Sequence, residues 1–266
     1  MSYRTRVEEK LGRREKRYET ERLMKEKRSE EYEVLEEVFD RSTLMTIYGL
    51  LNKGTIDQIF GAVKAGKESK LYWGKDKIGN ALAIKIFLTL SAEFKRGGMI
   101  PYIEGDHRFA HVKKDTRSLV YTWAQKEFKN LQQATAAGVR VPKPIAVSHN
   151  VLIMEFIGED GVSAPLLRET EVRNPKRIYS QVLLNVKILY QKAKLVHGDL
   201  SEYNIMIWKN EPVLFDVSQA VPIVHPLADQ LLRRDLENLN RYFERSGVKV
   251  LSFEKAYRKV TRGVKS

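Results

Sequence analysis

Three polar side chains stand at the ends of short apolar segments in the C-terminal part of the chain. Asp199 and Asn204 are five residues apart, and Asp216 follows twelve residues later. Two short strands, at residues 205–208 and 212–215, are predicted between Asn204 and Asp216. Carboxylates at the ends of apolar strands need either hydrogen-bond donors or a cation. The stretch therefore predicts a polar site built around a small hairpin.

The order and spacing of these groups suit phosphoryl transfer. A His-x-Asp-x-x-x-x-Asn motif followed by a strand-end Asp is the catalytic and metal-binding set of protein kinases. Asp199 can orient an acceptor hydroxyl or take its proton, while Asn204 Oδ1 and the Asp216 carboxylate can hold Mg²⁺, which prefers oxygen ligands. His197 is expected to brace the loop and not to react. The alternative interpretation is a hairpin whose Asp, Asn and Ser residues only cap turns.

A single lysine inside an apolar strand supplies the next part of such a site. Residues 81–88 read ALAIKIFL, which predicts a buried strand with one charge at Lys85. A buried lysine needs an anion, and Ile-Lys-Ile resembles the third strand of kinases, whose lysine meets the ATP phosphates and a helix glutamate. Glu127, on a helix predicted at residues 118–137, is the expected partner. The alternative is an edge lysine whose amine reaches water.

The segments expected to face the nucleotide are less distinctive. Two predicted strands flank a turn that reads KAGKES. In kinases the hairpin at this place covers the nucleotide and carries a G-x-G-x-x-G motif, which this chain lacks here. Lys67 and Ser69 in this turn are predicted to contact phosphates. By resemblance to kinases, the Glu155 carbonyl and the Ile157 amide are expected to meet adenine at the end of a strand.

Taken together, the motifs resemble the RIO family of atypical serine/threonine protein kinases. HGDLSEYN, DVSQ and HPLADQLLRRD match its RIO-one branch, of the archaeal type, whereas KAGKES is closer to the RIO-two form. The resemblance covers about residues 43–260. It implies binding of ATP with Mg²⁺ or Mn²⁺, autophosphorylation, and action on the pre-ribosomal small subunit, its rRNA and its proteins. In this family the strand-end Asp, here Asp216, is associated with an aspartyl-phosphate intermediate.

The strands and helices expected around these residues indicate an α+β, two-lobed kinase-like fold. We expect an antiparallel-sheet lobe at residues 43–155, with a mobile surface loop at about 89–117, and a reduced helical lobe at 156–266. Only 50 residues follow Asp216, which leaves no room for the peptide-binding helices of a standard protein kinase. Residues 1–42 are predicted to form a charged helical appendage.

The net charge of +13 lies outside the first 42 residues, in which 12 basic and 12 acidic side chains cancel. A basic folded body favours contact with a polyanion, and RNA is the obvious candidate. The alternative is general solubility charge together with the phosphate site itself. The chain has no cysteine for disulfides, no apolar run of membrane-spanning length and an N-terminus too charged for a signal peptide. We therefore expect a cytoplasmic protein that does not enter a membrane.

Two other functions share the central motif. HGD-x-x-x-x-N also marks small-molecule phosphotransferases of the aminoglycoside-kinase type, which have a larger acidic helical lobe than this chain can form. An ATP-gated scaffold that binds RNA or the ribosome is the second alternative, although the intact set of Lys85, Asp199, Asn204 and Asp216 argues against a dead site. The motifs together with the resemblance to the RIO family thus imply an ATP-dependent serine protein kinase with ATPase activity that autophosphorylates and acts in small-subunit maturation.

Overall fold

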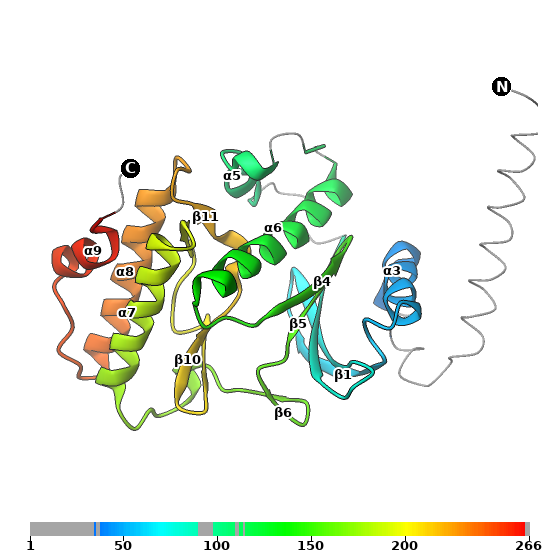
Figure 1. Cartoon of the computed structure of the whole chain (residues 1–266), viewed down its shortest axis with the longest axis horizontal. Helices are drawn as coiled ribbons and strands as arrows, with labels where there is room; N and C mark the ends of the chain where they lie inside the picture. The colour runs from blue at the N-terminus through cyan, green and yellow to red at the C-terminus, as the bar shows by residue number, and fades with distance from the viewer. Residues whose placement is uncertain (1–34, 36–37, 90–97, 110–111, 114, 264–266) are drawn as a thin grey trace, which may run out of the picture.

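The computed structural model describes residues 35, 38–89, 98–109, 112–113 and 115–263. Two lobes lie side by side, one built on a β-sheet and the other mainly helical (Figure 1). The predicted two-lobed α+β fold is therefore confirmed. The helical appendage predicted at residues 1–42 lies almost wholly outside the described residues.

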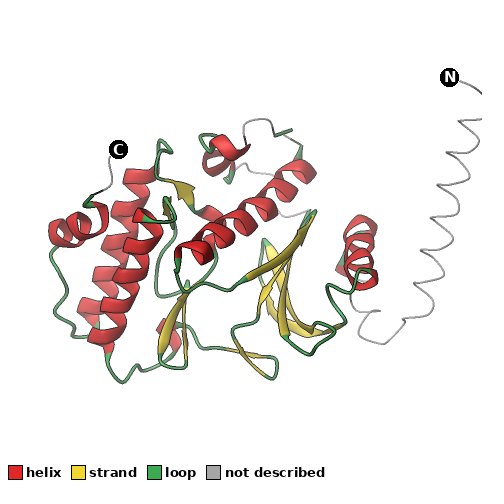
Figure 2. Ribbon diagram, in the orientation of Figure 1, coloured by secondary structure: helices red, strands yellow, loops and turns green. Residues whose placement is uncertain are grey.

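The first lobe contains a five-stranded antiparallel sheet in the order β1–β2–β3–β5–β4. Its strands are drawn in yellow in Figure 2. Hairpins produce most of this order. In the β2–β3 turn, the Asp76 carboxylate accepts the Ile78 and Asn80 amides at 3.0 and 2.8 Å. The strands are β1 (Gln58–Ala65), β2 (Ser69–Lys75), β3 (Ala81–Phe87), β4 (Pro144–Ser148) and β5 (Val151–Glu155).

Helices cover both faces of this sheet. Helix α3 (Arg41–Asn52) begins at Asp40, whose carboxylate accepts two first-turn amides. Because side chains alternate along a strand, Ile153 of β5 joins the core beneath α3, whereas its neighbour Leu152 joins the main core on the opposite face. Helix α6 (Thr116–Ala137) packs on that second face and ends at Gly138, whose φ of 86° suits glycine. The sheet is thus held between α3 and α6.

Residues 98–109, expected to lie in a surface loop, instead form helical turns packed against α6. They contain α5 (Ile100–Ile103) and a 3₁₀ turn at His107–Phe109. Ile103 is buried in the main core, and the ring of Tyr102 lies 6.1 Å from that of Trp123. The reason is the apolar sequence MIPYI, which buries surface that a solvated loop would leave in water.

Helices α7, α8 and α9 form most of the second lobe and contribute side chains to the main core, which continues beneath α6. The Tyr179 hydroxyl of α7 donates to Asn240 Oδ1 of α8 at 2.9 Å. No helix among the described residues is long and apolar enough to cross a membrane. The elements are β6 (Gly158–Glu159), β7 (Val162–Ser163), a 3₁₀ turn at Leu167–Glu169, α7 (Pro175–Gln191), β8 (Leu195–Val196), β9 (Ile205–Trp208), β10 (Glu211–Leu214), a 3₁₀ turn at Val217–Gln219, β11 (Val221–Pro222), α8 (Ala228–Arg245) and α9 (Phe253–Thr261).

Replacement of one buried isoleucine tests whether residues 98–109 belong to the core. Ile103→Ala should lower the free energy of unfolding by about 2–5 kcal/mol, because Ile103 is only 5% exposed. The matched control is Ile78→Ala. Because the Ile78 side chain is 84% exposed, this substitution should change the free energy of unfolding by no more than about 0.5 kcal/mol. Urea unfolding followed by tryptophan fluorescence measures both. If both substitutions change the free energy of unfolding equally little, residues 98–109 do not belong to the core and form a surface loop.

Candidate active site

A cavity of about 590 Å³ lies between the two lobes. It receives side chains from the β1–β2 turn, β3, β5, α6 and the loops around β8 to β10. Every predicted site residue except Asn204 lines it, namely Lys67, Ser69, Lys85, Glu127, Glu155, Ile157, Asp199 and Asp216. Residues far apart in sequence thus meet in one cleft.

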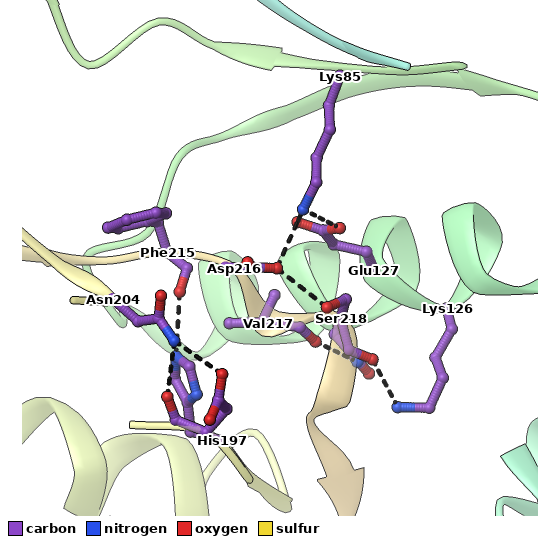
Figure 3. Close-up of polar contacts among 11 residues, drawn as sticks. Lys85, Lys126, Glu127, His197, Asn204, Phe215, Asp216, Val217 and Ser218 are labelled. Atoms are coloured by element: carbon purple, nitrogen blue, oxygen red, sulfur yellow. Dashed lines mark hydrogen bonds and ion pairs between the residues drawn. The ribbon is translucent and has the colours of Figure 1, made fainter. Parts of the chain in front are cut away.

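Lys85 is the centre of the polar contacts in this cavity (Figure 3). Its Nζ donates to both carboxylate oxygens of Glu127, at 3.0 and 2.8 Å, and to Asp216 Oδ1 at 3.0 Å. Burial disfavours the charged amine, but the charges of Asp216 and Glu127 outweigh it and raise the pKa of Lys85 above its usual value. Lys85 therefore stays an ammonium that links the sheet, α6 and the strand-end carboxylate.

Asp216 is held in a constrained backbone position at the start of the 3₁₀ turn. Its φ of 55° and ψ of 58° lie in the left-handed region, which few non-glycine residues occupy, although aspartate does so more readily than most. Burial would raise the pKa of Asp216, but the Lys85 ammonium and the Ser218 hydroxyl, 2.9 Å from Oδ1, hold it below its usual value. The side chain is 41% exposed, so the ionised carboxylate opens into the cavity.

The loop that carries Asp199 is fixed from below by α8. Asp235, almost fully buried, accepts the Gly198 and Leu200 amides at 2.8 Å each. Gly198 has a φ of 78°, and a Cβ atom there would lie 2.9 Å from the Gln219 carbonyl oxygen. Only glycine therefore lets this loop approach the segment that follows Asp216 so closely.

Asn204 lies behind Asp199 and not on the cavity wall. Its Nδ2 donates to the Asp199 carbonyl at 2.8 Å and to Asp199 Oδ2 at 3.0 Å. Burial, aided by the negative charge of Asp216, raises the pKa of Asp199, and the Asn204 bond opposes this rise. Asp199 is therefore a more basic carboxylate than a solvated one, which suits a group that accepts a proton.

His197 braces the site, as its sequence position predicts. Its ring is almost fully buried, and Nε2–H donates to the Phe215 carbonyl at 3.2 Å. Burial lowers the pKa of His197 to about 4, so the ring is neutral at pH 7. This hydrogen bond joins the Asp199 loop to the residue directly before Asp216.

Three supporting residues were not identified from the sequence. Lys126 and Asn130 of α6 hold the 3₁₀ turn after Asp216: Lys126 Nζ donates to the Ser218 carbonyl at 3.0 Å, and Asn130 Nδ2 donates to the Val217 carbonyl at 2.8 Å. The third is Asp235. Helical spacing could have indicated them, because each lies three or four residues from apolar residues on the buried face of its helix.

The same network reaches residues 98–109. Arg108 Nη2 donates to Asn130 Oδ1 at 2.8 Å and to Asp106 Oδ2 at 2.6 Å, and Asp106 is buried. Asn130 thus contacts the 3₁₀ turn on one side and Arg108 on the other. The packed part of the insert is therefore connected to the segment that carries Asp216.

The predicted adenine edge also lines the cavity. The Glu155 side chain points away, toward Arg140, with which it forms a bidentate ion pair at 3.0 and 3.1 Å. The Ile157 carbonyl accepts the Ala164 amide at 2.8 Å, which holds this strand end against β7. The backbone, and not the Glu155 carboxylate, is left to face a ligand in the cleft.

A cleft between a sheet lobe and a helical lobe, with a lysine–glutamate pair and two loop aspartates converging in it, defines the protein-kinase class of phosphotransferases. Structural comparison shows the same fold: the Rio2 kinase of Chaetomium thermophilum, solved as an ADP/Mg²⁺-phosphoaspartate complex, superposes with a TM-score of 0.62 at 23% identity. The match covers 84% of this chain and 67% of that one.

Sequence comparison specifies the family. A family model described as the RIO domain matches residues 70–256. The RIO-type serine/threonine-protein kinase Rio1 of Haloferax volcanii is 40% identical over 239 residues, which are 90% of this chain and 81% of that relative. Rio1 of Methanocaldococcus jannaschii is 37% identical, with coverages of 88% and 80%, and human RIO1 is 37% identical, with coverages of 85% and 40%. The chain belongs to the RIO family and is a serine/threonine-protein kinase.

The buried histidine makes stability depend on pH in a definite direction. The unfolded chain takes up a proton near pH 6.5, whereas folded His197 does not until about pH 4. Acidification from pH 8 to 5 should therefore cost about 2 kcal/mol of folding free energy through this group. His197→Asn, which keeps a donor for the Phe215 carbonyl, should lose less stability over that range. Urea unfolding at several pH values measures this, and identical slopes for both proteins would contradict it.

Proposed function

We propose that the protein is an ATP-dependent RIO-type kinase with ATPase activity, which autophosphorylates and acts on the pre-ribosomal small subunit in the cytoplasm. The observation that carries the proposal is the triple contact of Lys85 with Glu127 and Asp216 in the interlobe cavity, which Asp199 also lines. An ammonium fixed at that position can bind phosphate oxygens, and Asp199 can orient the group that receives the phosphoryl.

The side chains present fit a divalent cation. The Lys85 ammonium faces the carboxyl groups of Glu127 and Asp216, and Asp199 adds a third carboxyl group to the same cavity, so several oxygen atoms are available as ligands. Asn204 uses its Nδ2 toward Asp199, which leaves its Oδ1 as a possible oxygen ligand in addition to the Asp216 carboxylate. These two residues would hold Mg²⁺ or Mn²⁺. When bound, the ion offsets the negative charge of the phosphate oxygens.

The remaining site residues are assigned to the nucleotide. Lys67 and Ser69 line the cavity from the β1–β2 turn, where they can contact phosphates, and Lys85 with Glu127 lies deeper. The Glu155 carbonyl and Ile157 amide are assigned to adenine because these residues line the cavity at the end of β5 and directly beyond it. Each assignment rests on the place of the residue in the wall of the cavity that also contains Lys85.

Asp216 is proposed as a phosphoryl acceptor as well as a metal ligand. A carboxylate oxygen would bond to the γ-phosphorus while the bond to the ADP oxygen breaks, and ADP leaves. The support is that Asp216 is ionised, 41% exposed and turned into the cavity, while Lys85 holds its Oδ1. The phosphoaspartate of the Chaetomium Rio2 complex provides a precedent on the same fold.

Labelled ATP separates the products that different functions would release. We expect phosphoprotein and free phosphate, with the free phosphate increased by small ribosomal subunits. Asp199→Ala should lower this turnover by about 10²–10⁴-fold because the acceptor loses its orienting carboxylate, while ATP still binds. Asp216→Ala should weaken Mg²⁺-dependent ATP binding and remove any hydroxylamine-labile phosphoenzyme.

The control is Asp57→Ala, an exposed aspartate before β1, which should leave turnover unchanged. A phosphorylated small molecule as the main product would indicate a small-molecule phosphotransferase. ATP binding without turnover would indicate a scaffold. Either result, or unchanged turnover in Asp199→Ala, would overturn the proposed function.

A further inference from the structure

Basic residues gather along α9, the helix at the far left of Figure 1. Lys255, Arg258 and Lys259 follow one another at steps of three residues and one residue, which places them on one side of α9, and Arg262, the residue that caps the end of the helix, follows three residues later. Together with Lys187 of α7 they line an open groove of about 720 Å³, to which Thr261 also contributes. We call this surface the α7–α9 groove.

The charges in the α7–α9 groove repel one another. Lys255 and Lys259 are four residues apart in α9, the spacing at which like charges destabilise a helix, and Arg258 lies four residues before Arg262, which caps the end of α9. Among the described residues, none of the five cations of the groove forms an ion pair with an acidic side chain. The arrangement therefore has charge left for an anion from outside the chain.

The helix dipole explains only part of this row. Cations in the last turn of a helix are favourable because the carbonyl end carries a partial negative charge, which accounts for Arg258 and Lys259. Lys255 lies in the first turns of α9, where the dipole favours acids, and Lys187 belongs to another helix. These two lysines extend the positive charge beyond what the dipole requires.

The groove is held in a fixed shape by its supporting contacts. Gln191 Nε2 of α7 donates to the carbonyls of Val260 and Arg262, at 2.9 Å each, and so ties the end of α9 to α7. On its inner side α9 buries Ala256 and Val260 completely. The cations therefore project from a rigid base, which lowers the entropy lost when a ligand binds.

We propose that the α7–α9 groove binds the phosphate backbone of double-stranded RNA without reading its sequence. Arginine and lysine are the residues that bind phosphate, and the row spans about 10 Å of helix, along which a duplex presents several phosphates. The groove lining contains no aromatic side chain on which an unpaired base could stack and no apolar side chain that could hold a peptide. This inference rests on the proposed function only in taking RNA as a partner.

Charge removal at matched positions tests the proposal on the full chain. The variant Lys255→Gln/Arg258→Gln/Lys259→Gln should bind a labelled RNA duplex of about 20 base pairs at least about tenfold more weakly than the parent. The slope of the logarithm of its binding constant against the logarithm of the salt concentration should decrease in magnitude by about 1 for each neutralised cation. Fluorescence anisotropy at about 50–200 mM salt measures this slope. The control, Lys53→Gln/Lys77→Gln/Arg241→Gln, removes the same charge from exposed positions elsewhere and should keep most of the affinity.

Three results would overturn the inference: equal weakening in both variants, a stronger preference for single-stranded RNA, or loss of binding to phosphatidylserine vesicles with RNA binding unchanged. ATP turnover without RNA is measured in parallel and should be equal in the parent and both variants. If the parent hydrolyses no ATP but binds duplex RNA through this groove, the proposed enzyme function fails and the RNA surface stands.

Discussion

The arrangement of the cleft depends on one ammonium group held between two carboxylates. Lys85 is only 12% exposed, and a charge removed from water to that extent is costly unless it is paired. Glu127 and Asp216 supply the pairing from different lobes and from sites 42 and 131 residues away in sequence. The contact therefore fixes the distance between the sheet, α6 and the strand-end loop, and removal of Lys85 would leave two neighbouring carboxyl groups without the cation that they share.

Helix α6 connects this contact to the rest of the molecule. One turn presents Glu127 to Lys85, and the neighbouring Lys126 and Asn130 hold the backbone carbonyls that follow Asp216. Through Arg108, Asn130 also reaches the packed part of the insert between β3 and α6. A shift of α6 would thus change both the lysine pair and the Asp216 loop, so the insert lies where it could influence the site.

The sequence predicted the groups that react better than the groups that support them. Lys85 was identifiable because a lone charge in an apolar strand requires a partner, and the family motif indicated Asp199 and Asp216. Asp235 and Lys126 bond backbone groups more than 30 residues away, so their roles appear only once the chain is folded. The packed segment at residues 98–109 was missed because glycines and basic residues around it obscured the short apolar run MIPYI.

The most direct test of this account is a double-mutant cycle on Mg²⁺-ATP affinity, measured by calorimetry for Lys85→Met, Glu127→Gln and the double variant. If Glu127 acts by holding the Lys85 ammonium, the double variant will bind no more weakly than Lys85→Met alone. Losses that add independently would contradict the claim, because the two side chains would then contribute to the site separately.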